Sequence, residues 1–146
     1  AVRLRPPKHW AKRWGCSIPG FFSMSRKRLA LLITRATPES AFAPLMMAAT
    51  AAAMDYDCKL FFAFGGLELL RPEPVLDVPA AMAGALPRLV ELREICHQQG
   101  VEMIACSASL DMLSLTREQL IPQVTVAGMA TWLAFASGAE IQLNFG

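Results

Sequence analysis

Short apolar runs alternate with helix-forming stretches about five times between residue 28 and the end of the chain. The apolar runs are RLALLIT, YDCKLFFAF, VEMIAC, QVTVAG and AEIQLNF, and turn residues or helical stretches separate them. Runs of this length and character are typical of strands buried on both faces. Strands that alternate with helices predict one α/β domain: a parallel sheet of about five strands with helices on both faces, flavodoxin-like or Rossmann-like.

Local signals place the helices between these strands. Thr37, followed by a proline and a glutamate, is a candidate N-cap for an alanine-rich helix over residues 41–54. Three prolines in residues 71–79 predict a loop. An amphipathic pattern then predicts one long helix over residues 80–99, which ends at Gly100.

The composition is unusually apolar, with 54% hydrophobic residues, 18% charged residues and a mean hydropathy of +0.37. Such a chain can bury a large core, and it is expected to bury further apolar surface between subunits of a homo-oligomer. No run reaches the roughly 18–20 apolar residues of a membrane-spanning helix. Contact with a membrane surface stays open.

The charge is uneven along the chain. Residues 1–28 hold eight basic residues and no acidic one, whereas the rest holds six basic and all twelve acidic residues. A domain with an acidic balance is a poor binder of nucleic acid. Residues 1–23 lack periodicity and are expected to be a disordered basic extension, a wrongly assigned start or a cloning remnant, unless they form an arm that packs on a partner. Residues 24–146 are predicted to form the domain.

Four cysteines, without a secretory signal or a dense pairing pattern, favour free thiols in the reducing cytoplasm. Metal binding is not indicated, because there is no C-x-x-C motif and only Cys96 and His97 stand as adjacent ligands. The chain also lacks the glycine-rich phosphate-binding fingerprints. The sequence therefore indicates no metal and no cofactor.

The main candidate for chemistry is Cys106, at the end of the third predicted strand. Ligands of open α/β sheets collect at the carboxyl ends of the strands. The small neighbours Ser107 and Ser109 would leave room for a sulfur substrate, and a helix that begins at Ser107 would favour a thiolate. The alternative is that Cys106 is a small buried hydrophobic residue.

Two further residues are candidates for the same site. Cys96 lies late in the preceding helix, and the rise of the intervening strand would separate it from Cys106 by roughly 15–20 Å. Cys96 is therefore either a core residue or a second sulfur-handling thiol, and a direct disulfide is geometrically poor. Arg35 follows the first strand at the same edge, where it would stabilise a thiolate or a bound anion, unless it is an ordinary surface arginine.

Several segments together resemble the DsrE/DsrF-like sulfurtransferase family, in the branch found beside TusA-type sulfur carriers and rhodaneses. These segments are residues 28–70, "GVEMIACSASLDMLSL" and "GMATWLAFASGAEIQLNF". The resemblance implies an oligomeric α/β subunit that carries sulfane sulfur on a cysteine at the position of Cys106, with a second cysteine at Cys96. One departure is that Ser107 and Ala108 are smaller than the residues usual there.

The function expected from these features is sulfur transfer. Cys106 would accept sulfane sulfur or thiosulfonate and pass it to a partner thiol, with a TusA-like carrier or a rhodanese as donor or acceptor. Whether the protein is a carrier or a true catalyst stays open. Two alternatives are a non-enzymatic oligomeric scaffold and a thiol redox sensor that uses Cys96 and Cys106.

Overall fold

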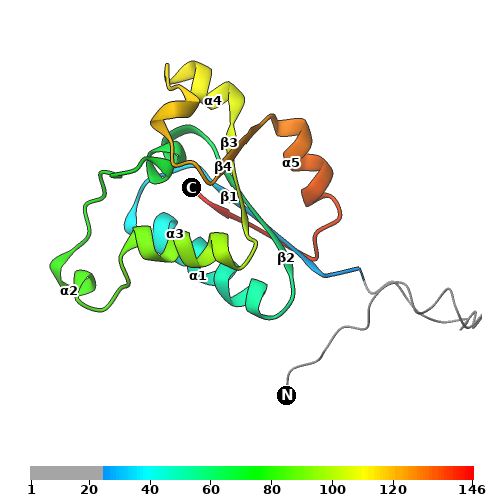
Figure 1. Cartoon of the computed structure of the whole chain (residues 1–146), viewed down its shortest axis with the longest axis horizontal. Helices are drawn as coiled ribbons and strands as arrows, with labels where there is room; N and C mark the ends of the chain where they lie inside the picture. Colours follow the sequence, from blue (N-terminus) through cyan, green and yellow to red (C-terminus); the bar gives the residue numbers. More distant parts are fainter. Residues whose placement is uncertain (1–24) are drawn as a thin grey trace, which may run out of the picture.

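The computed structural model describes residues 25–146, which form one five-stranded sheet (Figure 1). Every pair of neighbouring strands is parallel, so the predicted parallel sheet is confirmed. The expectation for residues 1–23 falls outside the described residues. The strands are β1 (Arg28–Ile33), β2 (Asp57–Phe62), β3 (Glu102–Cys106), β4 (Val124–Ala127) and β5 (Ile141–Phe145).

Helices cover both faces of the sheet, as the sequence predicts. The helical elements are α1 (Pro38–Ala53), η1 (Phe64–Leu70), α2 (Ala80–Ala83), α3 (Leu89–Gln98), α4 (Ser107–Met112), η2 (Arg117–Gln119) and α5 (Met129–Ala136). In Figure 1, α1 and α3 lie together against one face and α5 lies against the other, while α4 stands at the end of the sheet. The two faces therefore have separate apolar cores.

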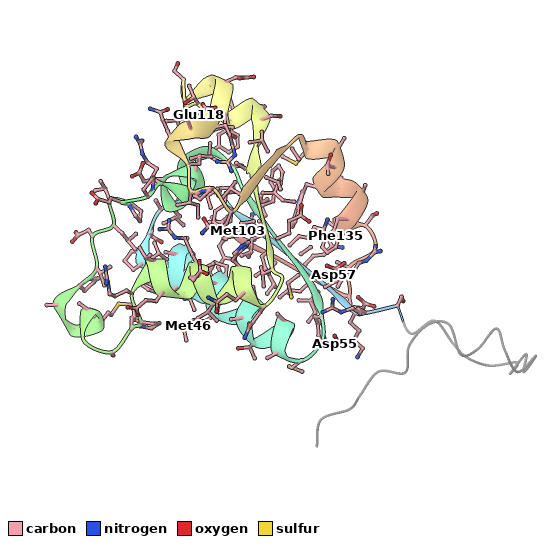
Figure 2. All side chains as sticks on the ribbon, in the orientation of Figure 1. Met46, Asp55, Asp57, Met103, Glu118 and Phe135 are labelled. Carbon is pink, nitrogen blue, oxygen red and sulfur yellow. The ribbon has the colours of Figure 1, made fainter. Side chains whose placement is uncertain are left out.

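The side chains of β3 alternate between the two cores. Met103 and Ala105 pack into the core under α1 and α3, whereas Ile104 and Cys106 pack into the core under α5. Successive side chains of a strand point to opposite faces, so this split follows from the extended backbone itself. Met103 and Phe135, labelled in Figure 2, belong to these two different cores.

The strand order is β4-β3-β2-β1-β5. The chain steps in one direction from β1 to β4 and then returns across the sheet through α5 to place β5 beside β1. This order is neither the flavodoxin order 2-1-3-4-5 nor the Rossmann order, although all share the doubly covered parallel sheet. Because the strands are parallel, all five carboxyl ends meet at one edge.

The local signals are mostly confirmed. Thr37 is the N-cap of α1, with its side-chain oxygen accepting a hydrogen bond from the Ser40 N–H at 3.2 Å, and Gly100 has the left-handed φ of 81° of a helix-ending glycine. The single helix predicted over residues 80–99 is wrong, because the chain forms the short α2 and then α3. Pro87 explains the break, since it lacks an N–H and disfavours helical backbone in the residue before it.

Candidate functional site

Cys106 is the last residue of β3 and the N-cap of α4, so the helix begins at Ser107 as predicted. The side chain is only 4% exposed and packs into the α5-side core with Trp132. The strands on both sides contribute small residues: Ala127 pairs with Cys106 in β4, and Ala63 follows the last paired residue of β2. The side chains on both sides of the Cys106 thiol at the carboxyl edge are therefore small.

The loops that follow the strands close in around this edge. A Cβ at Gly65 would come 3.3 Å from the Thr34 carbonyl oxygen, so the turns after β2 and β1 are in contact. A Cβ at Gly128 would come 3.8 Å from the Ser107 hydroxyl, so the start of α5 lies beside the start of α4. The sulfur of Cys106 therefore sits where α4 and α5 both begin.

The two serines after Cys106 have different surroundings. Ser107 is half-buried and faces the turn before α5. Ser109 is 1% exposed, and its hydroxyl oxygen accepts a hydrogen bond of 3.0 Å from the Phe64 N–H. Ser109 thus ties α4 to the turn after β2. A substrate contact for either serine stays a prediction.

Phe64 is a part of this edge that the sequence analysis did not single out. It has a φ of 49°, in the left-handed region that a bulky residue rarely adopts, and its side chain is 53% exposed. Strained residues persist where surrounding structure holds them and cluster at functional sites. The signal in the sequence was the Gly65–Gly66 pair directly after an apolar strand.

Arg35 lies at the same edge as Cys106, in the loop after β1, as predicted. Its side chain is exposed, and β2 separates its strand from that of Cys106. Neighbouring strands are about 4.8 Å apart, so the two strand ends are roughly 10 Å apart. Within the described part of the chain, Arg35 forms no ion pair, and its predicted role in binding an anion stays a prediction.

The structure does not bring Cys96 and Cys106 together. Cys96 is fully buried in the core under α1 and α3, on the opposite face of the sheet from Cys106, and its thiol donates to the Leu45 carbonyl oxygen at 3.3 Å. Cys58 packs in the same core as Cys96. The sheet itself therefore separates the two thiols that the sequence analysis assigned to one site.

Burial sets the chemistry of these two core thiols. It raises the pKa of Cys96 to about 11, with Cys58 adding to the rise, and it raises the pKa of Cys58 to about 11, with Asp57 adding. The thiolate is the nucleophilic form of cysteine. Both side chains are therefore neutral thiols at physiological pH.

These pKa values predict a loss of stability at high pH. Since both folded pKa values lie above the ordinary 9.0, the unfolded chain releases these protons first as the pH rises. We expect full stability below pH 9 and a fall, of the order of 2 kcal/mol per thiol, towards pH 11. Urea unfolding measured at several pH values checks this, and Cys96→Ala should show a shallower fall. Equal slopes in both proteins would contradict it.

Two further features of residues 25–146 bear on the kind of site. No group of three histidine, cysteine or acidic side chains comes together there to hold a metal ion. No helix in that part of the chain is long and apolar enough to cross a membrane. Both statements concern the described residues only.

The fold and the site define a class of protein: a parallel α/β domain with a thiol at the carboxyl end of its third strand. The chain belongs to the DsrE/DsrF/DrsH-like family, whose model matches residues 25–85 and 79–144. The family resemblance seen in the sequence is therefore confirmed.

Sequence relatives agree with this membership, and a solved structure agrees with the fold. The chain is 31% identical over 157 residues to the sulfur carrier protein DsrE2 of Allochromatium vinosum, across 82% of this chain and 99% of the relative. It is 24% identical to the uncharacterized protein YrkE of Bacillus subtilis, across 80% and 96%. The crystal structure of ychN from E. coli has the same fold, with a TM-score of 0.62 and 19% identity, across 82% of this chain and 99% of that one.

Proposed function

We propose that this protein is a sulfur carrier that holds sulfane sulfur on Cys106 and passes it to a partner thiol. One observation carries the proposal: of the three described cysteines, Cys106 alone ends a strand at the carboxyl edge, where ligands of parallel sheets bind. Cys58 and Cys96 lie in the opposite core, where burial keeps them as neutral thiols. The similarity to a sulfur carrier protein supports the same function.

The chemistry is an exchange at sulfur. The Cys106 thiolate attacks the outer sulfur of a donor persulfide, the donor's S–S bond breaks, and the donor leaves as a thiolate. Cys106 then carries the persulfide. In the second step an acceptor thiolate attacks the outer sulfur, the S–S bond to Cys106 breaks, and Cys106 leaves as a thiolate. The first N–H groups of a helix have no partner within it, and the start of α4 at Ser107 is therefore expected to favour negative charge near this sulfur. Arg35 and Ser107 are proposed to contact an anionic donor.

The partners proposed for this exchange are proteins that present a thiol or persulfide, as TusA-like carriers and rhodaneses do. Two exposed apolar side chains stand close to the site and would contact such a partner. Phe64 begins η1 and is 53% exposed, and Met129 begins α5 and is 44% exposed. Each lies two residues after the end of a strand that neighbours β3. The three free cysteines of the described chain are compatible with the cytoplasmic location expected from the sequence.

Intact-mass measurement tests the proposal. The reduced full chain is incubated separately with thiosulfate, tetrathionate and polysulfide, beside the variants Cys106→Ser and Cys96→Ser. We expect an adduct of sulfane sulfur or thiosulfonate on the wild type and on Cys96→Ser, and its loss from Cys106→Ser. Cys96→Ser is the matched control because it replaces a buried thiol in the opposite core. A number of adducts per chain that is unchanged between the wild type and Cys106→Ser, or no adduct on the wild type, would refute the proposal.

We propose a homo-oligomer as the assembly state, with β5 as the contact between copies. Among the described strands, β5 pairs only with β1, so its outer edge is open. Ile141 and Leu143 are 38% and 41% exposed, and a cavity of about 320 Å³ lined by Met46, Met47 and Ile141 lies beside them. The strand has no charge and no proline, the usual protections of an open edge. Antiparallel pairing with β5 of a second copy would cover this edge.

A charge placed on this edge should weaken the assembly. We expect Leu143→Lys to raise the dissociation constant at least about tenfold, because the ammonium would be buried between copies. Sedimentation velocity over a range of concentrations measures this. Val75→Lys is the control, since Val75 is 82% exposed in a loop and the substitution likewise replaces an aliphatic residue by lysine. Equal masses for wild type and Leu143→Lys would rule out β5 as the contact.

A further inference from the structure

A small cavity lies between α3 and the segment that leads into β4, away from the edge that carries Cys106. Its volume is about 60 Å³. Apolar and polar side chains both line it, and the polar ones come from segments far apart in the sequence. The lining residues are Val90, Arg93, Glu94, Met103, Ile121 and Gln123.

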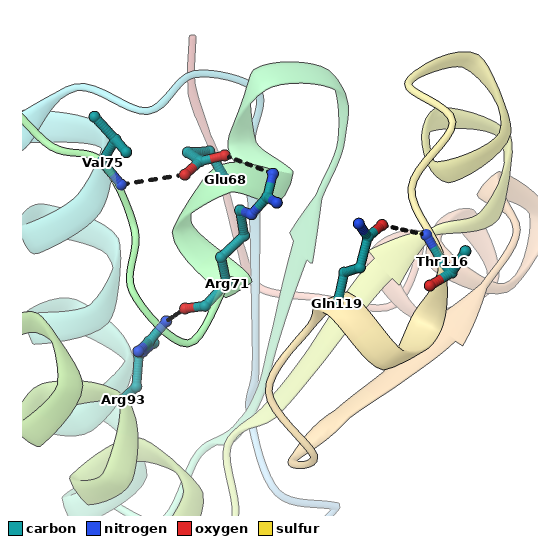
Figure 3. A network of polar contacts seen from close by, with 6 residues as sticks. All are labelled: Glu68, Arg71, Val75, Arg93, Thr116 and Gln119. Atoms are coloured by element: carbon teal, nitrogen blue, oxygen red, sulfur yellow. Dashed lines mark hydrogen bonds and ion pairs between the residues drawn. The ribbon is translucent and has the colours of Figure 1, made fainter.

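Two polar atoms of this lining are buried without a hydrogen-bond partner among the described residues: the Nε–H of Arg93 and the Oε1 of Gln123. Arg93 is only 4% exposed, and its other nitrogens are already engaged. Nη1 donates to the carbonyl oxygens of Leu69 and Arg71 at 2.7 Å each, and Nη2 donates to that of Pro72 at 3.4 Å. Figure 3 shows Arg93 reaching the Arg71 carbonyl. A buried donor and a buried acceptor thus line the same cavity.

The orientation of the Gln123 amide is fixed by its neighbour. Its Nε2 donates to Oε2 of Glu94 at 3.4 Å, and a reversed amide would turn an oxygen towards that carboxylate. Oε1 is therefore left as an acceptor. Glu94 also accepts from the exposed Gln98 at 2.9 Å, so its carboxylate keeps its own partners.

These atoms define the occupant by its chemistry. It must accept a hydrogen bond from a guanidinium N–H and donate one to an amide oxygen. An unprotonated anion has no proton for Oε1 and would approach the Glu94 carboxylate, while a cation would approach Arg93. A water molecule has both functions, and a cavity needs only about 10–15 Å³ to hold one.

We propose that this cavity is a built binding site for water, in which one molecule accepts from Arg93 Nε and donates to Gln123 Oε1. The bound water joins α3 to the approach to β4. It also completes the bonding of the arginine that holds the end of η1 and the start of the proline-rich segment. The site is independent of the proposed sulfur chemistry at Cys106.

A crystal structure of the full chain at high resolution tests the site directly. We expect an ordered water about 2.7–3.2 Å from both Arg93 Nε and Gln123 Oε1. A second crystal soaked in sodium bromide, with anomalous data at the bromine edge, separates water from an anion. A bromide peak in the cavity would overturn the choice of a neutral occupant, and a dry cavity at both atoms would overturn the site.

A solution measurement uses a matched pair of variants. In the ¹⁵N-labelled wild type, the Arg93 Hε should show a nuclear Overhauser cross-peak to water with the sign of a long-lived molecule. Gln123→Met removes the acceptor, so we expect that cross-peak to be lost. Gln98→Met removes an amide that binds the same Glu94 but lies outside the cavity, so we expect the cross-peak to remain. Retention in Gln123→Met, or absence from the wild type, would contradict the proposal.

Discussion

Replacing Gly66 by alanine is expected to lower the free energy of unfolding by about 3 kcal/mol. A Cβ at Gly66 would collide with the Ile33 carbonyl oxygen, and this oxygen also accepts the Ala63 N–H at 2.9 Å. The neighbour is the backbone of Ile33, a fully buried residue at the end of β1, so it cannot rotate away as a side chain would. The turn after β2 would have to move, and Phe64 would move with it. Urea unfolding followed by far-UV circular dichroism measures the loss.

Gly84→Ala is the matched control for this substitution. A Cβ at Gly84 would meet no atom within 4 Å, and the residue has an ordinary helical φ of −81°. We expect Gly84→Ala to leave the unfolding midpoint unchanged or slightly raised, since alanine restricts the unfolded chain. If Gly66→Ala and Gly84→Ala gave equal midpoints, the close approach of β1 to the turn after β2 would not hold in solution.

The fold could be predicted from the sequence because its signals are local. Each apolar run became a strand of the parallel sheet, and the Thr37 cap marked the start of α1 within the loop after β1. The prediction of one long helix over residues 80–99 was wrong because it also relied on a local signal alone. Its amphipathic pattern continues through Pro87, and the prediction followed this periodicity although a proline interrupts the hydrogen bonds of a helix.

The candidate site was predictable only in part. A cysteine at a strand end needs one strand and one turn to be recognised, and Cys106 was placed correctly at the start of α4. The face on which Cys96 lies depends on which side of the sheet α3 crosses. That side is fixed by packing and by the handedness of the crossover, not by the spacing between two cysteines. The split between the two cores therefore emerged only in the structure.

Backbone-directed contacts were beyond sequence reasoning altogether. Arg117 donates to the carbonyl oxygen of Val124, the first residue of β4, at 2.6 Å and to that of Pro122 in the preceding loop at 2.8 Å. Carbonyl oxygens occur at every residue, so no residue type marks the partner of such an arginine. Ser109 is a second case, because its hydroxyl oxygen accepts from the Phe64 backbone N–H, while its substrate contact stays a prediction.

Arg93→Met is expected to lower the free energy of unfolding by about 3 kcal/mol. Arg93 is buried, and burial lowers the pKa of its guanidinium. Its Nη1 satisfies two carbonyl oxygens, at Leu69 and Arg71, that would otherwise lose a donor. Methionine fills much of the volume of the arginine but donates no hydrogen bond. The two buried carbonyl oxygens would then lack a donor, and their loss of hydration would no longer be compensated. Urea unfolding measures the total loss, and limited proteolysis within residues 72–79 should show faster cleavage of the segment that Arg93 holds.

Arg88→Met separates this effect from the loss of any positive charge. Arg88 is the nearest arginine along the chain, its side chain is 79% exposed, and its ion pair with Glu91 is long at 3.9 Å. An exposed pair of this kind contributes less than about 1 kcal/mol, so its removal should leave both readouts near those of the wild type. Proteolysis that accelerates equally in both variants would mean that the segment opens without help from Arg93. An unfolding midpoint that is unchanged in Arg93→Met would mean that water replaces the guanidinium at these carbonyl oxygens. The hydrogen bonds from Arg93 to Leu69 and Arg71 would then contribute no stability.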